Sequence, residues 1–98
     1  MTPVDRLLEE ALGHHQAGRL AEAVSRYQQL LLTRPKHPVA LCYLGVALGQ
    51  TGRLEEAVEH LKKALAIQPD FFDAHINLGK AFENRADSRM RWSATSTR

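Results

Sequence analysis

The fold is decided by a seven-residue block that occurs twice, as Gly18–Val24 (GRLAEAV) and as Gly52–Val58 (GRLEEAV). The two copies are separated by 34 residues. Overlaying residues 4–37 on residues 38–71 gives ten identities, six of which fall inside this block. A fixed period of this length indicates a repeat architecture.

Each repeat is predicted to form two helices. Apolar residues recur every three to four positions on both sides of Gly18 and Gly52, which allow a tight turn, and Pro35 and Pro69 end the second helix of each unit. No stretch alternates with a period of two, so the predicted fold class is all-α. The helices are expected near 3–17, 20–33, 38–51, 54–67 and 71–86.

A third repeat begins but is not completed. Residues 78–81 (LGKA) match residues 44–47 (LGVA) at the same shift, but Ala86 then stands at the place of the turn glycine. We therefore predict one domain, residues 1–86, made of repeats 4–37 and 38–71 and a half repeat 72–86. Residues 87–98 are predicted to be a polar, disordered tail; the alternative is a longer last helix on which Met90 and Trp92 fold back as a cover.

The pattern resembles the tetratricopeptide repeat (TPR) family, whose unit is a 34-residue helix–turn–helix with a Leu-Gly pair, a later alanine and a closing proline. The resemblance covers about residues 4–86 and implies a right-handed superhelix of antiparallel hairpins. The second repeat carries it best, through Leu41, Leu44, Gly45, Leu48, Gly52, Leu54, Ala57, Leu61, Ala64 and Pro69.

Composition sets limits on the function. The chain has 98 residues, one cysteine and 24% charged residues, which suits one globular domain without a disulfide. Residues 1–84 hold nine Lys/Arg against ten Asp/Glu, whereas residues 85–98 hold four arginines against one aspartate. The basic surplus therefore belongs to the tail, and nucleic acid is not an expected partner. No apolar run reaches the length of a membrane span, and a cytoplasmic location is expected.

Catalysis finds no support in the residue pattern. The five histidines, His14, His15, His37, His60 and His75, include no pair spaced i, i+4, and Cys42 lies among apolar neighbours. We expect no enzyme activity, no metal and no cofactor.

The resemblance implies a concave groove, lined by the first helix of each hairpin, that receives a peptide or helix of a partner protein. A clamp for the terminal carboxylate of chaperone tails, which some family members have, is not expected, because apolar residues occupy the positions where the clamp needs polar groups. The predicted groove residues are Asp5, Leu8, Leu12, His15, Val39, Cys42, Tyr43, Val46, Gln50, Asp73, Ile76, Asn77, Lys80 and Asn84.

Three functions stay open. The leading hypothesis is a non-catalytic interaction module whose partner is a protein or peptide. The second is a self-assembling unit that forms homo-oligomers through the uncovered last helix, with Phe71, Phe72, Leu78 and Phe82 as the contact residues. The third, by family analogy alone, is an N-terminal substrate-delivery fragment of a longer TPR-bearing enzyme such as a glycosyltransferase.

Overall fold

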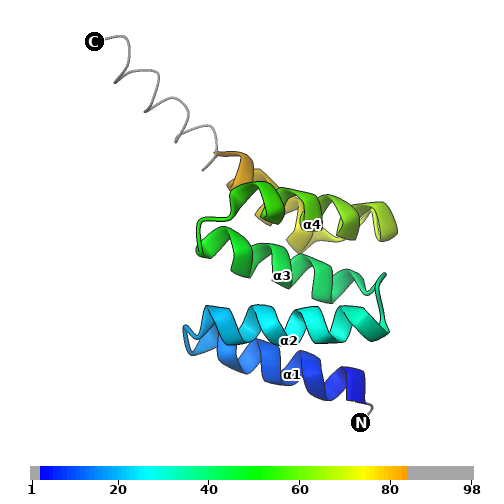
Figure 1. The fold of residues 1–98 in the computed structure, drawn as a ribbon. Helices are drawn as coiled ribbons and strands as arrows, with labels where there is room; N and C mark the ends of the chain where they lie inside the picture. Colours follow the sequence, from blue (N-terminus) through cyan, green and yellow to red (C-terminus); the bar gives the residue numbers. More distant parts are fainter. Residues whose placement is uncertain (1–2, 84–98) are drawn as a thin grey trace, which may run out of the picture.

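The computed structural model describes residues 3–83, which form five helices. They are α1 (Pro3–Gln16), α2 (Leu20–Thr33), α3 (Pro38–Gln50), α4 (Leu54–Ile67) and an unlabelled fifth helix, which starts at residue 72 and runs to the end of the described residues (Figure 1). The predicted site residue Asn84, the predicted end of the last helix at residue 86 and the predicted tail 87–98 lie outside the described residues.

The predicted all-α fold is confirmed, and each described helix boundary lies within one residue of its prediction. Gly18 and Gly52 have φ angles of 83° and 92°, a left-handed conformation that glycine adopts without steric penalty. At the end of α1 the amide of Arg19 donates to the carbonyl of His14 at 2.9 Å, and that of Gly18 donates to His15 at 3.1 Å. These bonds satisfy carbonyls that the helix end leaves without partners.

The start of α3 holds a cap that the sequence analysis did not identify. The backbone amide of Ala40 donates to Nδ1 of His37 at 3.2 Å. Pro38 follows as the first helical residue, where its missing N–H loses no bond. His37 therefore helps to begin the second repeat and is not part of the predicted groove.

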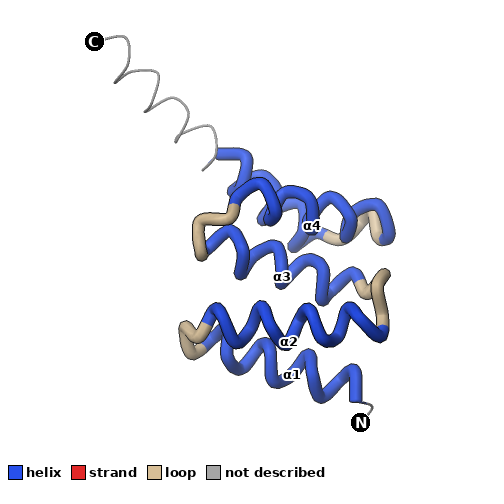
Figure 2. The backbone as a smooth tube through the Cα atoms, viewed as in Figure 1, coloured by secondary structure: helices blue, strands red, loops and turns tan. Residues whose placement is uncertain are grey.

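The helices pack as consecutive antiparallel neighbours, α1 on α2, α2 on α3 and α3 on α4, with the loops at alternate ends (Figure 2). The buried side chains form two clusters, and each draws on more than one repeat. The first cluster contains Ala57 of α4 together with Tyr27 of α2. The second cluster contains Cys42 of α3 together with Ala81 of the fifth helix. The repeats therefore share their cores, as expected of a solenoid.

The two ends of the array differ in polarity. Ala40 and Ala47 of α3 are fully buried, whereas their repeat equivalents in α1, Arg6 and Gly13, are exposed. At the other end, Phe82 of the fifth helix is 37% exposed, whereas its equivalent in α3 is fully buried. The outer face of α1 is therefore polar, while the fifth helix presents apolar surface.

Candidate functional site

The predicted groove residues within residues 3–83 lie on α1, α3 and the fifth helix. Asp5, Gln50, Asp73, Ile76 and Lys80 are exposed. The half-buried members, which combine surface with core contacts, are Leu8, Leu12, His15, Val39, Tyr43, Val46 and Asn77.

Cys42 does not belong to the groove, and its prediction as a groove residue is wrong. Its side chain has no exposed surface and packs in the core cluster with Ala74 of the fifth helix. Burial raises the pKa of the Cys42 thiol to about 11, and the negative charge of Asp73 adds to the rise, while a hydrogen bond with the side chain of Asn77 opposes it. The fifth helix covers this position, so the thiol is a packing group.

His15 links the groove sides of α1 and α3. Its Nε2 lies 2.6 Å from Oε1 of Gln50, and its Nδ1 lies 3.2 Å from the hydroxyl of Tyr27. A carbonyl oxygen only accepts, so the Nε2–H group of His15 donates to Gln50. The His15 and Tyr27 rings meet edge to face, with centroids 6.2 Å apart. These contacts fill the junction between the first two repeats with ring atoms.

Tyr27 and Tyr43 complete the filling of this first junction. Tyr27 is fully buried, and this burial raises its pKa above the ordinary range, with smaller contributions from Tyr43 and Cys42. Burial likewise raises the pKa of Tyr43. Both phenols therefore stay neutral at physiological pH.

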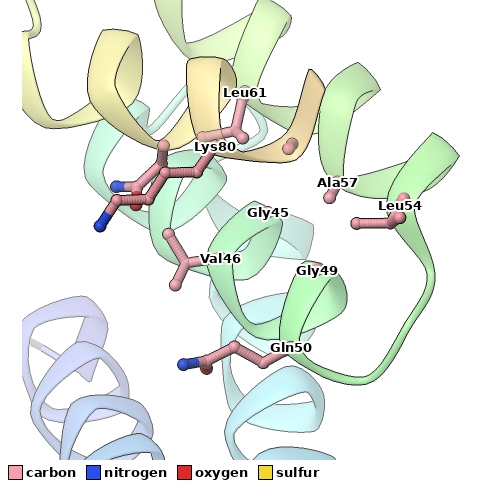
Figure 3. A pocket seen from close by; sticks show the side chains of 10 residues that line it. Gly45, Val46, Gly49, Gln50, Leu54, Ala57, Leu61 and Lys80 are labelled. Atoms are coloured by element: carbon pink, nitrogen blue, oxygen red, sulfur yellow. The ribbon is translucent and has the colours of Figure 1, made fainter. Parts of the chain in front are cut away.

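The second junction, between α3, α4 and the fifth helix, contains a pocket of about 280 Å³ (Figure 3). Four predicted groove residues meet there: Val46 and Gln50 from α3, and Asn77 and Lys80 from the fifth helix. In Figure 3 the side chains of Val46, Gln50 and Lys80 extend toward the same side. The remaining lining residues, which sequence reasoning missed as site residues, are Gly45, Gly49, Leu54, Ala57, Leu61 and Ala81.

The pocket exists because smaller residues replace the rings of the first junction. Under the 34-residue shift, Gly49 stands at the place of His15, and Leu61 stands at the place of Tyr27. Asn77 similarly replaces Tyr43, which removes a third ring. The loss of ring residues at equivalent positions is the sequence signal for this pocket. It becomes visible when the two junctions are compared residue by residue, and not when each helix is considered by itself.

The lining combines an apolar floor with a polar rim. Leu54, Ala57 and Leu61 are apolar, whereas the rim carries an amide on Gln50, an amide on Asn77 and the ammonium of Lys80. Lys80 makes no ion pair with any residue from 3 to 83. Since Lys80 is the one titratable group among the lining residues, the arrangement favours binding by apolar contact and hydrogen bonding over acid–base chemistry.

The residues predicted for self-association differ in exposure. Phe72 is 72% exposed and Phe82 is 37% exposed, whereas Phe71 and Leu78 are half-buried against the second core cluster. The ammonium of Lys62 lies 5.7 Å from the centroid of the Phe82 ring, a cation–π contact that covers part of it.

Metal sites and membrane-spanning helices are two further features to consider within residues 3–83. These residues contain no group of three or more His, Cys, Asp or Glu side chains placed to hold a metal ion. None of the helices in this part of the chain has the length and hydropathy needed to span a membrane.

Comparisons with known proteins give a consistent result. The model of a family described as TPR repeat matches residues 49–84. Tetratricopeptide repeat protein 13 of Homo sapiens is 39% identical over 62 residues, which are 63% of this chain and 7% of that protein. The chain thus spans a small part of this human relative.

Solved structures match over most of the described fold. The Sgt2 TPR domain from Aspergillus fumigatus has a TM-score of 0.83 and 28% identity, and the match covers 90% of this chain and 59% of that one. A crystal structure of MamA has a TM-score of 0.80 and 19% identity, and the match covers 85% of this chain and 48% of the MamA chain. At this identity the likeness concerns the fold alone.

Proposed function

We propose that the chain, which is similar to TPR proteins in its repeats and in its fold, is a non-catalytic module that binds a peptide or helix of a partner protein in its concave groove. TPR folds generally mediate protein–protein interactions. A cytoplasmic location belongs to the same proposal, because a chain with one cysteine does not depend on an internal disulfide.

The observation that carries the proposal is the convergence of groove residues from separate helices. The contact between His15 and Gln50 ties α1 to α3 at 2.6 Å, and the pocket brings Val46 together with Asn77 and Lys80. A surface that is already in place loses little conformational entropy on binding, which suits peptide recognition.

The proposal is tested by capture with immobilised full-length chain and by competition with the captured partner's own peptides. Val46→Asp is expected to abolish binding by placing a charge in the apolar centre of the groove. Ser25→Asp is the matched control, because Ser25 is exposed on α2, outside the predicted groove. Circular dichroism checks that helicity is retained, and the near-isosteric Val46→Thr provides a milder variant if Val46→Asp unfolds. Binding that survives both Val46 variants would contradict the groove as the site.

A second candidate function is self-association through the fifth helix. In the second repeat, a Cβ atom placed on Gly45 would approach Leu61 and Ala57 of α4, whereas the equivalent atom on Gly79 would have no neighbour within 4 Å among residues 3–83. The fifth helix thus has an open position where a further helix packs closely in the preceding repeat.

Sedimentation of the full chain over a range of concentrations tests this second candidate. A dimer or larger species is expected, and Phe82→Asp is expected to return it to a monomer. Leu32→Asp is the matched control, because Leu32 is 84% exposed on α2, away from the fifth helix. A chain that stays monomeric at all concentrations contradicts self-association.

A further inference from the structure

We propose that the pocket between α3, α4 and the fifth helix binds an aromatic side chain of a partner peptide that carries an acidic residue next to it. This inference rests on the proposed groove function and names the chemistry of its ligand. It is drawn from the difference between the two junctions of the repeat array.

The space in the second junction is suited to a ring because rings fill the first. There, Tyr27 is fully buried and meets His15 edge to face. In the second junction Leu61 and Gly49 stand at these places and leave a pocket of about 280 Å³. An apolar cavity of about 150 Å³ is enough to hold benzene. The pocket therefore has room for an aromatic ring together with its methylene group.

The lining matches the faces of a flat apolar group. Gly45 and Gly49 line the pocket without a side chain, and Ala57 and Leu61 supply apolar contacts from α4 (Figure 3). Oε1 of Gln50 is bonded to His15 and Nδ2 of Asn77 donates to the carbonyl of Asp73, so the remaining N–H groups of these two amides are the ones that can pair with the peptide backbone of the ligand. A pocket of this kind, apolar inside with a few polar groups at its opening, is typical of ligand sites.

The positive charge of Lys80 at the rim of the pocket indicates which residue should stand beside the aromatic residue in the ligand peptide. Lys80 is exposed and makes no ion pair within the described part of the chain. A carboxylate on the residue beside the ring would meet this ammonium. The chain's own Trp92 is a poorer occupant, because residues 85–98 hold four arginines against one aspartate and would bring like charge to Lys80.

The test uses nuclear magnetic resonance of the ¹⁵N-labelled full chain with blocked tetrapeptides as probes. Acetyl-Gly-Phe-Asp-Gly-amide is expected to shift the backbone amides of Gly45 and Gly49 and the side-chain amide of Asn77 in a saturable manner. The matched peptide with lysine in place of aspartate is expected to bind about fivefold more weakly, the range of an exposed ion pair. The peptide with alanine in place of phenylalanine is expected to cause no saturable shift.

Two variants locate the ligand. Gly49→His restores the imidazole of the first junction and is expected to abolish binding, and its Cβ fits because the nearest atom, Cβ of Ala57, is 3.6 Å away. Gly13→His is the matched control, because within residues 3–83 nothing beyond its chain neighbours and its own helix backbone lies within 4 Å of its Cβ position, and it does not line the pocket. Lys80→Glu is expected to reverse the preference, so that the lysine peptide binds more tightly.

Several results would overturn the inference. One is the absence of saturable shifts at Gly45 and Gly49 with the aspartate peptide; another is unchanged binding in Gly49→His, and a third is an unchanged preference in Lys80→Glu. If Trp92→Ala itself moves the Gly49 amide in the free chain, the occupant is the chain's own segment. Partner capture that Val46→Asp abolishes but Gly49→His and Lys80→Glu leave intact would retain the groove function and reject this ligand class alone.

Discussion

Leu61 of α4 lies so close to Gly45 of α3 that its Cγ atom would be 2.8 Å from a Cβ atom at position 45. The carbonyl oxygen of Ala57 would be 3.1 Å from the same atom. Backbone cannot yield to an added methyl group as easily as the end of a flexible side chain can. The absence of a side chain at Gly45 is therefore what sets the spacing of the α3–α4 hairpin.

Gly45→Ala is expected to destabilise the protein by about 1–3 kcal/mol, because the added methyl group forces α3 and α4 apart. Urea unfolding followed by circular dichroism gives the free energy of unfolding. Gly49→Ala is the matched control, and its Cβ would lie at an ordinary 3.6 Å from Cβ of Ala57. It is expected to stabilise the protein by about 0.5–1 kcal/mol through helix propensity. Equal effects of the two substitutions would show that the close approach is unimportant.

Gly52→Ala is expected to lower the free energy of unfolding by about 1–2 kcal/mol, because alanine at a φ of 92° meets the steric penalty of the left-handed region. Gly13→Ala, in the interior of α1 with open space around it, is expected to raise the free energy of unfolding instead. The same unfolding measurement compares them. A neutral Gly52→Ala would mean that the turn can adopt another conformation at no loss.

His15 and Gln50 are expected to be energetically coupled across the first junction. A double-mutant cycle of His15→Ala and Gln50→Ala should give a coupling of about 0.5–1.5 kcal/mol in unfolding free energy, as for one hydrogen bond between side chains. Gln16→Ala combined with Gln50→Ala should be additive, because Gln16 is exposed on α1 and is not bonded to Gln50. Additivity in the His15 cycle would contradict the bond at 2.6 Å.

Cys42 is expected to resist thiol reagents in the folded protein and to react quickly in urea. Burial raises its pKa from 9.0 to about 11, and folding therefore favours the neutral thiol. Stability from this group is fully present below about pH 9 and is lost as the pH rises toward 11. Unfolding midpoints measured between pH 8 and 11 should fall more steeply for the wild type than for Cys42→Ala. Parallel curves would show that the thiol does not couple to folding in this pH range.

The helices were predictable from the sequence because their limits are set locally. A left-handed glycine at Gly18 or Gly52 and a proline at Pro35 or Pro69 end each element within one residue of its predicted place. By contrast, the groove prediction included Cys42, which is fully buried, because helical spacing does not show how far the next helix covers a neighbouring position.

The pocket was not predictable from any single helix. It forms because Gly49, Leu61 and Asn77 have no ring, whereas their equivalents in the first junction do. These three residues belong to three different helices. The bond between His15 and Gln50 likewise joins side chains 35 residues apart, and its existence depends on how α1 and α3 lie side by side. Packing between repeats, rather than the repeat pattern, decides both features.

Because the two ends of the array differ in polarity, further repeats are more easily added by protein engineering at one end than at the other. A consensus repeat joined in register before Pro3 would press on Arg6 and Gly13, which would first have to be changed to the alanines found at Ala40 and Ala47. As far as the described residues show, a helix added behind the fifth helix would meet apolar Phe82 and the open backbone of Gly79 without any such change. A fused binding domain or a longer designed solenoid is therefore best attached at the carboxyl-terminal side, where the existing surface already accepts it.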